Sequence, residues 1–490
     1  MAALLRLWLA AGNAGLTMDS PLYVNMADSL AKGAKAVGPA HHGYPAAIAI
    51  ARLVLPGREL PGRAVSMLAG LALVVLVYRL ARRGSPPWAA ALAAGLVALH
   101  PLLAVYSGPI MTESLFLALL FTALLVLDQG HPLAAGLTLG ASYVVRPEGL
   151  VAAAGTMLFG RLGWRGAARL AAGFAVIAAA YVGYLSWERG TFTLTPKEAL
   201  VHAPAAGRSA EWRIENPARM AGDPTPTLAE RLREAAPGIV ANYLPRLGAH
   251  LTRLIEAWPW PLLILSLVGL IARPGPVAAP LLQLLVIPML AVAPEARFAM
   301  LYVPSLAVLA AMGAQACVSW AARWRRAAYA ATAAAALAGV VWTWGGPPAR
   351  LALHFDDGPM PEMRAAGEWL RENGSPDQVV IDRKAYVPFF AGMRHIQLPN
   401  DDYETLVEYA LRSGARYMVI EEYVAESLRP QLLPLLADAR FREQEPRLRA
   451  VFHVREGPHS GVVVMEVLPS AADEPRSSDE APASGLDGGR

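Results

Sequence analysis

Residues 88–112 read WAAALAAGLVALHPLLAVYSGPIMT and contain no Asp, Glu, Lys or Arg. An apolar run of at least about 18 uncharged residues is long enough to cross the hydrocarbon core of a bilayer as one helix. Comparable runs follow at residues 170–187, 274–294, 298–322 and 327–349, and shorter ones lie at 64–78, 114–127, 129–145, 149–160 and 257–272. With a weaker N-terminal run that Arg6 interrupts, the sequence predicts about eleven transmembrane helices.

The composition of the whole chain agrees with a membrane protein. Of the 490 residues, 55% are hydrophobic and 17% are charged, whereas soluble chains are about 45–50% apolar and about 25% charged. The mean hydropathy is +0.36. A net charge of +4 is too dilute over this length for a nucleic-acid-binding surface, so no nucleic-acid partner is expected. The single cysteine, Cys317, excludes a disulfide framework and a thiolate metal cluster within one chain.

The arginines predict the orientation of the helices. Cytoplasmic loops carry an excess of basic residues, and placing the N-terminus in the cytoplasm puts three clusters and one single arginine in inner loops. These residues are Arg79, Arg82, Arg83, Arg161, Arg165, Arg169, Arg273, Arg323, Arg325 and Arg326. Only four of the 43 basic residues are lysines, which together with abundant Ala, Gly and Pro indicates a GC-rich bacterial genome. We therefore predict a multi-pass protein of the bacterial cytoplasmic (inner) membrane whose C-terminal domain is extracytoplasmic.

The chain is expected to have three parts. Residues 1–345 form the transmembrane domain, with large outer loops at about 15–62 and 188–256. Residues 346–469 alternate between helical and strand patterns, which predicts a soluble α/β domain. Its helices are expected at 360–372, 403–412 and 424–437, and its strands at 378–381, 417–420, 450–454 and 461–467. Residues 470–490 are rich in Ala, Ser, Pro and acids and are predicted to be disordered.

Several charged residues stand singly where the uncharged runs meet the predicted outer surface. They are Asp19, Glu113, Arg146, Glu148 and Arg297. Ionisable residues at mid-depth would mark an ion or substrate path across the membrane. Charges at the outer ends of several helices instead favour a reaction site at the extracytoplasmic interface.

Four motifs carry a resemblance to a known family. They are MDSPLYVNMADSLAKG (18–33) with HGYP (42–45), LHPL (99–102) with YSGPIMTE (106–113), RPEG (146–149), and PEARF (294–298) with YVP (302–304). In this order they resemble bacterial C-type glycosyltransferases, the protein O-mannosyltransferase-like and lipid A aminoarabinose transferase-like enzymes of glycosyltransferase family 39 type. The resemblance implies the C-type fold. It also implies inverting transfer of a sugar, hexose or pentose, from a polyprenyl-phosphate donor to a lipid, glycan or protein acceptor.

The resemblance also implies roles for particular residues. A carboxylate can orient the acceptor and take its proton, and the planar fork of arginine suits the phosphate that leaves. We expect Asp19 and Glu113 to be catalytic. We expect substrate binding by Arg146, Glu148, Arg297, His42 and Tyr23. The ordinary alternatives are a helix cap for Asp19, a favourable helix-dipole position for Glu113, snorkelling arginines, simple pairing of Glu148 with Arg146, and an interfacial aromatic for Tyr23.

Two departures from the family pattern keep other interpretations open. Ser20 stands where many members carry a second acid, and Gly43 stands where proline is usual. A catalytically degenerate scaffold of the same fold is therefore one alternative. A transporter or flippase of lipid-linked sugars is another, but it predicts mid-depth charges and inverted repeats, which the sequence lacks. The sequence requires no cofactor; acids and histidines on one face permit a divalent metal ion without demanding it.

Overall fold

The computed structural model describes residues 1–12, 16–17, 19–36, 38, 40–196, 228–273, 275–290, 296–353, 360–455 and 460–468. The predicted disordered tail, 470–490, lies outside the described residues. The chain divides into two compact units, Met1–Met360 and Pro361–Arg490. Each unit is described by itself.

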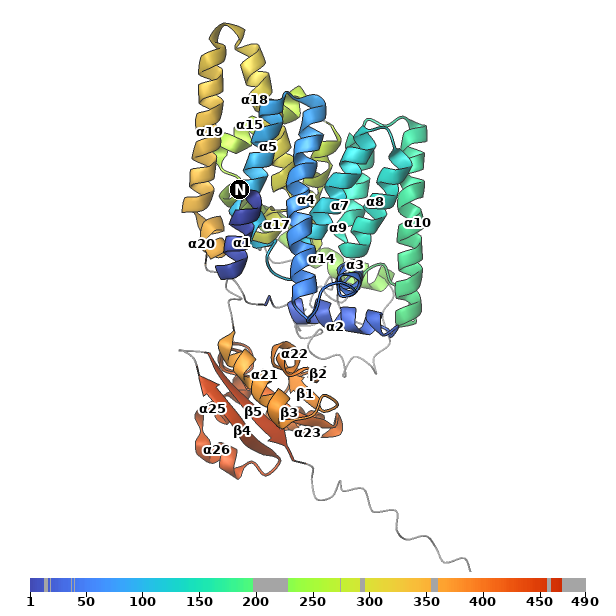
Figure 1. The fold of residues 1–490 in the computed structure, drawn as a ribbon. Helices are drawn as coiled ribbons and strands as arrows, with labels where there is room; N and C mark the ends of the chain where they lie inside the picture. Colours follow the sequence, from blue (N-terminus) through green and yellow to red (C-terminus); the bar gives the residue numbers. More distant parts are fainter. Residues whose placement is uncertain are drawn as a thin grey trace, which may run out of the picture. The chain divides into compact units, whose positions relative to one another are not determined.

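The first unit is built of helices (Figure 1). They are α1 (Ala2–Gly12), α2 (Ser20–Ala31), α3 (Gly43–Ala51), α4 (Leu60–Gly84), α5 (Pro87–Leu99), α6 (Pro101–Val105), α7 (Glu113–Asp128), α8 (Pro132–Val145), α9 (Glu148–Phe159), α10 (Trp164–Arg189), α14 (Leu228–Ala257), α15 (Trp260–Ala272), η2 (Pro276–Leu282), α16 (Gln283–Val286), η3 (Ile287–Leu290), α17 (Ala296–Ala299), α18 (Val303–Trp320), η4 (Ala322–Trp324), α19 (Arg325–Gly345) and α20 (Pro347–Leu353).

Among the described residues, four helices are individually long and apolar enough to cross a membrane. They are α4, α10, α18 and α19. A further pair, the second part of α14 and α15, meets the same test together but is bent by 105°. Shorter apolar helices include α1, α5, α8 and α9. The chain is thus an α-helical polytopic membrane protein, and the number of about eleven spans stays a prediction.

Small residues allow neighbouring helices to approach closely, as is common where apolar helices pack in membranes. The contact between α15 and α18 is the clearest case. A Cβ atom on Gly269 would come within 1.9 Å of the Leu309 carbonyl oxygen, and one on Gly313 within 1.9 Å of the Leu265 carbonyl oxygen. Ser266 also donates across this contact to the Leu306 carbonyl at 2.9 Å. Any side chain at position 269 or 313 would therefore collide with the backbone of the facing helix, so both positions require glycine.

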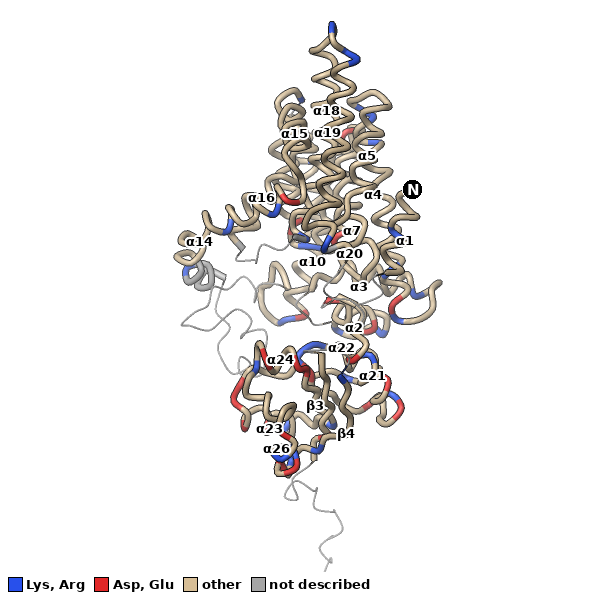
Figure 2. The backbone as a smooth tube through the Cα atoms, turned by 90° about the vertical axis from the view of Figure 1, so that its left-hand side faces the viewer, with Lys and Arg blue, Asp and Glu red and all other residues tan. Residues whose placement is uncertain are grey.

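Charged residues are sparse along the helices of the first unit and gather near their ends (Figure 2). At one end, which we call the arginine end, Arg83 is ion-paired with Asp128, and Arg273 donates to the Gly84 carbonyl. The α7 helix runs from Glu113 to Asp128. Glu113 therefore marks the opposite end of this helix, which we call the site end.

The second unit is a small α/β domain. Its five strands are β1 (Val379–Asp382), β2 (Arg394–Gln397), β3 (Ala415–Glu421), β4 (Leu448–Arg455) and β5 (Gly461–Val467). The sheet order is β2-β1-β3-β5-β4. Strand β1 is parallel to β2 and β3, whereas β5 is antiparallel to β3 and β4. The helices are α21 (Pro361–Asn373), α22 (Tyr386–Ala391), α23 (Tyr403–Arg412), α24 (Glu422–Ser427), η5 (Pro430–Leu432), α25 (Leu433–Ala437) and α26 (Ala439–Gln444).

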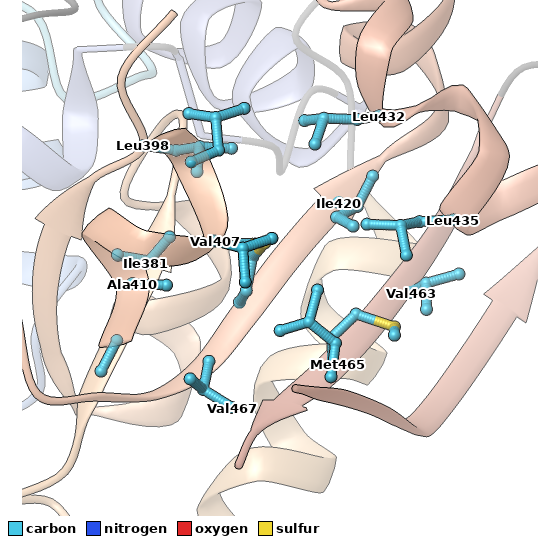
Figure 3. Packing of buried hydrophobic residues seen from close by; sticks show 14 of the residues in the cluster. Ile381, Leu398, Val407, Ala410, Ile420, Leu432, Leu435, Val463, Met465 and Val467 are labelled. Atoms are coloured by element: carbon cyan, nitrogen blue, oxygen red, sulfur yellow. The ribbon is translucent and has the colours of Figure 1, made fainter. Parts of the chain in front are cut away.

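The core of this domain lies where α23 and α25 cover the sheet. Leu406, Val407 and Ala410 of α23 are buried at helical spacing. They meet Ile381 of β1 and Met465 of β5 in one cluster (Figure 3). Apolar residues spaced with a period of 3.6 in α23, and the buried runs of β1, β3 and β5, thus account for the predicted α/β class.

The predicted helix at 424–437 is wrong in one respect. The structure divides this segment into α24, η5 and α25, and the break falls at Pro430. Proline has no N–H to donate and disfavours helical backbone in the residue before it. Strand β2, which the sequence analysis did not find, is a short strand at the edge of the sheet with the polar sequence RHIQ.

Candidate active site

Arg146 forms the buried centre of the site end. It lies between α8 and α9 in extended backbone, which Pro147 favours because a residue before proline avoids helical angles. Its Nη1 lies 2.7 Å from Oε1 of Glu113, and its Nη2 lies 2.6 Å from Oε1 of Glu148. Nη1 also donates to Oγ1 of Thr112 at 2.9 Å. One guanidinium thus joins the start of α7 to the start of α9.

This cluster is almost closed to solvent. Glu113 is 1% exposed, and Arg146 and Glu148 are also buried. A buried ion pair is stable when its partners also satisfy one another's hydrogen bonds, and removing one partner leaves a costly unpaired charge. Tyr302, just before α18, is buried and within electrostatic reach of Glu148. Its hydroxyl has no hydrogen-bond partner among the described residues.

A second ion pair at the site end is more accessible. Nη1 of Arg297, in α17, lies 3.3 Å from Oδ2 of Asp19. The Asp19 side chain is 37% exposed and that of Arg297 is 25% exposed. Asp19 occupies the N-cap position of α2, but its side chain makes no capping hydrogen bond. The carboxylate is therefore directed to the arginine, not to the helix end.

Tyr23 lies within reach of both ion pairs. It is buried on α2 and packs edge-to-face against Tyr44, with ring centroids 5.3 Å apart. Burial raises the pKa of its phenol, the charges of Asp19 and Glu113 raise that pKa further, and Arg146 and Arg297 act in the opposite direction. Four predicted site residues from separate parts of the chain thus act electrostatically on one tyrosine.

Both departures from the family pattern have a packing role. Ser20 is buried and donates from Oγ to the Ile110 carbonyl at 3.3 Å, which ties α2 to the turn that leads into Glu113. A Cβ atom on Gly43 would come within 2.8 Å of the carbonyl group of Val144, at the end of α8. A glycine lets α3 approach α8 just before Arg146. Ser20 and Gly43 therefore both contribute to helix packing next to Glu113 and Arg146.

His42 lies in a different cluster from Arg146 and Asp19. Its Nδ1 is 3.1 Å from the hydroxyl of Tyr181, and its Nε2 is 3.5 Å from Oε1 of Glu188. Tyr184 donates to the same carboxylate oxygen at 3.1 Å. The His42 ring therefore connects the segment before α3 to the end of α10.

Sequence reasoning missed Glu188, Thr112 and Tyr302 as members of these clusters. Glu188 could have been found, because it ends the uncharged run 170–187 just as Glu113 ends the run 88–112. Thr112 and Tyr302 stand inside the motifs YSGPIMTE and YVP, but nothing in these motifs marks them as members of the Arg146 cluster, because that grouping depends on tertiary packing. Residues 294–295 of the fourth motif lie outside the described residues.

The acidic residues of the site end do not fit a metal ion as they are arranged. Within the described part of the chain, no three His, Cys, Asp or Glu side chains are grouped to hold one. Glu113 and Glu148 both bind the Arg146 guanidinium, which lies where a shared cation would bind. We therefore derive no reaction step through a metal ion at this position.

Solved structures with the same fold were found by comparison. ArnT from Cupriavidus metallidurans in the apo state aligns over 94% of this chain and 95% of its own, with a TM-score of 0.57 and 12% identity. The Archaeoglobus fulgidus oligosaccharyltransferase in complex with Zn and sulfate aligns over 97% of this chain and 73% of its own, with a TM-score of 0.59 and 14% identity. Both are C-type glycosyltransferases. This chain has the C-type glycosyltransferase fold.

A second ArnT structure, bound to undecaprenyl phosphate, shows the same C-type fold. It aligns over 95% of this chain and 96% of its own, with a TM-score of 0.55 and 12% identity. No protein-family model and no curated protein matches the sequence. The expected C-type fold is thus confirmed through structure, at a sequence identity where the likeness concerns the fold alone.

Proposed function

We propose that the protein is a membrane glycosyltransferase that moves a sugar from a polyprenyl-phosphate donor to an acceptor, with inversion at the anomeric carbon. The observation that carries this proposal is the pairing of an exposed Asp19 with Arg297 beside the buried Arg146 cluster, in a protein with the C-type fold. An ArnT structure of that fold holds undecaprenyl phosphate, which supports a lipid-phosphate donor.

Asp19 is the base in this proposal. The carboxylate takes the proton of the acceptor hydroxyl or amine while the acceptor atom forms its bond to C1 of the sugar. The bond between C1 and the phosphate oxygen breaks, and its electron pair leaves with the polyprenyl phosphate. Asp19 suits this role because it is the most exposed of the predicted site residues whose ion pairs are described.

The two arginines have separate roles. Arg297 is the more exposed guanidinium and already holds the proposed base, so it binds the donor phosphate and neutralises the charge that grows there. Arg146 is enclosed by Glu113, Glu148 and Thr112 and supports the geometry around Tyr23. Glu113, expected to be catalytic, becomes a positioning residue in this proposal because its carboxylate is buried against Arg146.

The proposed reaction takes place on the extracytoplasmic face of the bacterial inner membrane. The support is that Arg83 and Arg273 lie at the end of the helices opposite Glu113. Cytoplasmic loops carry an excess of basic residues, so this end is assigned to the cytoplasm. His42 supports the fold of the outer segment in this proposal. The donor is a hexose or pentose linked to polyprenyl phosphate, and the acceptor is a lipid, glycan or protein.

The test is Asp19→Asn in membranes supplied with a radiolabelled polyprenyl-phosphate sugar. Loss of a general base costs about 10²–10⁴-fold in rate, so we expect transfer to fall by at least about a hundredfold. The matched control is Asp28→Asn, an ion-paired aspartate on the same helix α2 whose partners are Arg52 and Arg58. Asp28→Asn should retain most of the activity.

Three results would overturn the proposal. Undiminished transfer by Asp19→Asn would remove Asp19 as the base. Movement of the labelled lipid across the membrane without any transfer, by the unmodified protein, would instead favour a flippase. Binding of the labelled lipid with neither transfer nor movement would indicate the degenerate scaffold.

A further inference from the structure

Helix α14 lies across the direction of the membrane-spanning helices. Its second part, Ala236–Ala257, is bent by 105° relative to α15. The corner is fixed, because Trp258 is buried and its Nε1 donates to Oγ of Ser266 on α15 at 3.0 Å. Helix α15 itself lies along α18, which is long and apolar enough to cross a membrane. Figure 2 shows α14 extending sideways from the bundle.

The corner between α14 and α15 is at the site end of the bundle. Arg273, which directly follows α15, is at the arginine end, so α15 begins at the opposite end. There α14 packs against α17, and His250 faces Phe298 with ring centroids 6.3 Å apart. Phe298 directly follows Arg297, which is paired with Asp19. Helix α14 therefore lies at the level of the candidate site.

One edge of α14 is apolar and exposed. Val240 is 76% exposed, Leu244 is 73% exposed and Leu251 is 39% exposed. Separations of four and seven residues place these three side chains on one edge of a helix. Asn242 and Arg253 are exposed on the opposite side, because nine residues, about two and a half turns, separate Asn242 from Leu251 and Leu244 from Arg253. One apolar edge and one polar edge are typical of helices that lie in a membrane interface.

The exposed apolar edge continues on α15 beyond the corner. Trp260, Ile264, Leu267 and Ile271 are exposed at helical spacing. In a membrane protein such an edge faces the acyl chains, and tryptophan at the end of an apolar helix is typical of the interface between lipid and water. Exposed apolar surface that extends over two helices marks an interaction site. Lipid against the edge of α14 would continue the lipid contact of α15 around the corner.

We propose that Ala236–Ala257 is an interfacial helix whose edge of Val240, Leu244 and Leu251 is embedded in the acyl chains of the leaflet at the site end. The partner is the bilayer surface itself, and the polar side of the helix faces water. A separate membrane crossing by α14 does not fit, because it would place Arg246 and Arg253 in hydrocarbon. The proposal concerns contact with the membrane and does not depend on the glycosyltransferase activity.

The test measures the depth of spin labels on the full-length protein in vesicles of phosphatidylethanolamine and phosphatidylglycerol. Cys317→Ala removes the one native cysteine, and Val240→Cys or Leu244→Cys is then labelled with a nitroxide. Oxygen concentrates in the acyl chains, whereas a charged or chelated nickel complex stays in water. Both labels should collide more with oxygen than with nickel, at a depth of about 5–10 Å into the boundary between headgroups and acyl chains.

The matched control is Asn242→Cys in the same background, whose label should collide more with nickel. If the label at position 244 is as accessible to nickel as the label at 242, the edge faces water and the proposal is wrong. If the label at 244 is accessible to neither reagent, protein covers the edge, from this chain or a second copy, and the proposal is also wrong. All three positions are exposed, so the variants should elute from gel filtration as the unmodified protein does. Loss of transfer activity would not change the measured depth, so this test and that of Asp19→Asn can fail independently.

Discussion

Arg146 is the charged residue that the structure describes at the site end as buried against two carboxylates, those of Glu113 and Glu148. Replacement by methionine would leave Glu113 and Glu148 buried without a cation, and breaking a buried ion pair in this way costs about 3–5 kcal/mol. We therefore expect Arg146→Met to lower the unfolding temperature in detergent strongly. A triple variant that adds Glu113→Gln and Glu148→Gln should recover a large part of that loss.

The comparison of these two variants separates charge from packing. If the triple variant is as unstable as Arg146→Met, then the loss comes from the shape of the side chain and the buried charges do not matter. Arg83→Met at the arginine end serves as the control, because Arg83 and its partner Asp128 are largely exposed. An exposed ion pair contributes about 0–1 kcal/mol, so this variant should change the unfolding temperature little.

The same residues show what could be predicted from the sequence. Glu113 and Arg146 stood out because a charge that interrupts a long apolar run needs a reason. Their pairing could not be predicted, since Arg146 was equally consistent with a snorkelling side chain or a phosphate ligand. His42 was grouped with them through motif order alone, whereas its actual partners, Tyr181 and Glu188, come from α10, far along the chain.

The pairing of α15 with α18 depends on two glycines, and its strength can be tested. Gly313→Ala places a Cβ against the Leu265 carbonyl, so the two helices must separate. Overpacking of this kind costs about 1–3 kcal/mol. We expect a lower unfolding temperature and faster hydrogen exchange in both helices.

Gly183→Ala is the matched control, because Gly183 lies inside α10 and a Cβ there meets nothing within 4 Å. Alanine is the better helix former by about 1 kcal/mol, so this variant should be neutral or slightly stabilising. Equal destabilisation by both changes would contradict the close-approach explanation. The sequence predicted both helices from their apolar runs, but the requirement for glycine at position 313 appears only when the partner helix is in place.

The distribution of charge over the first unit predicts which face of the membrane each end occupies. Arg83 and Arg273 lie at the end of the bundle opposite Glu113, and the positive-inside rule assigns that end to the cytoplasm. The chain has one cysteine, Cys317, so Cys317→Ala gives a background in which single reporter cysteines can be introduced. The reporters are Gln129→Cys, next to Asp128, and Ser375→Cys, on the exposed surface of the C-terminal domain.

In intact spheroplasts, a membrane-impermeant maleimide should label Ser375→Cys and leave Gln129→Cys unlabelled. After permeabilisation, both should react, which shows that each thiol is accessible in the folded protein. The opposite pattern would reverse the orientation and place Asp19 and Arg297 on the cytoplasmic side. Labelling of both reporters before permeabilisation would mean that the segments between residues 129 and 375 do not have the predicted odd number of crossings. Because a polyprenyl-phosphate sugar can be used only on the face where Asp19 lies, this measurement also decides on which side the proposed reaction occurs.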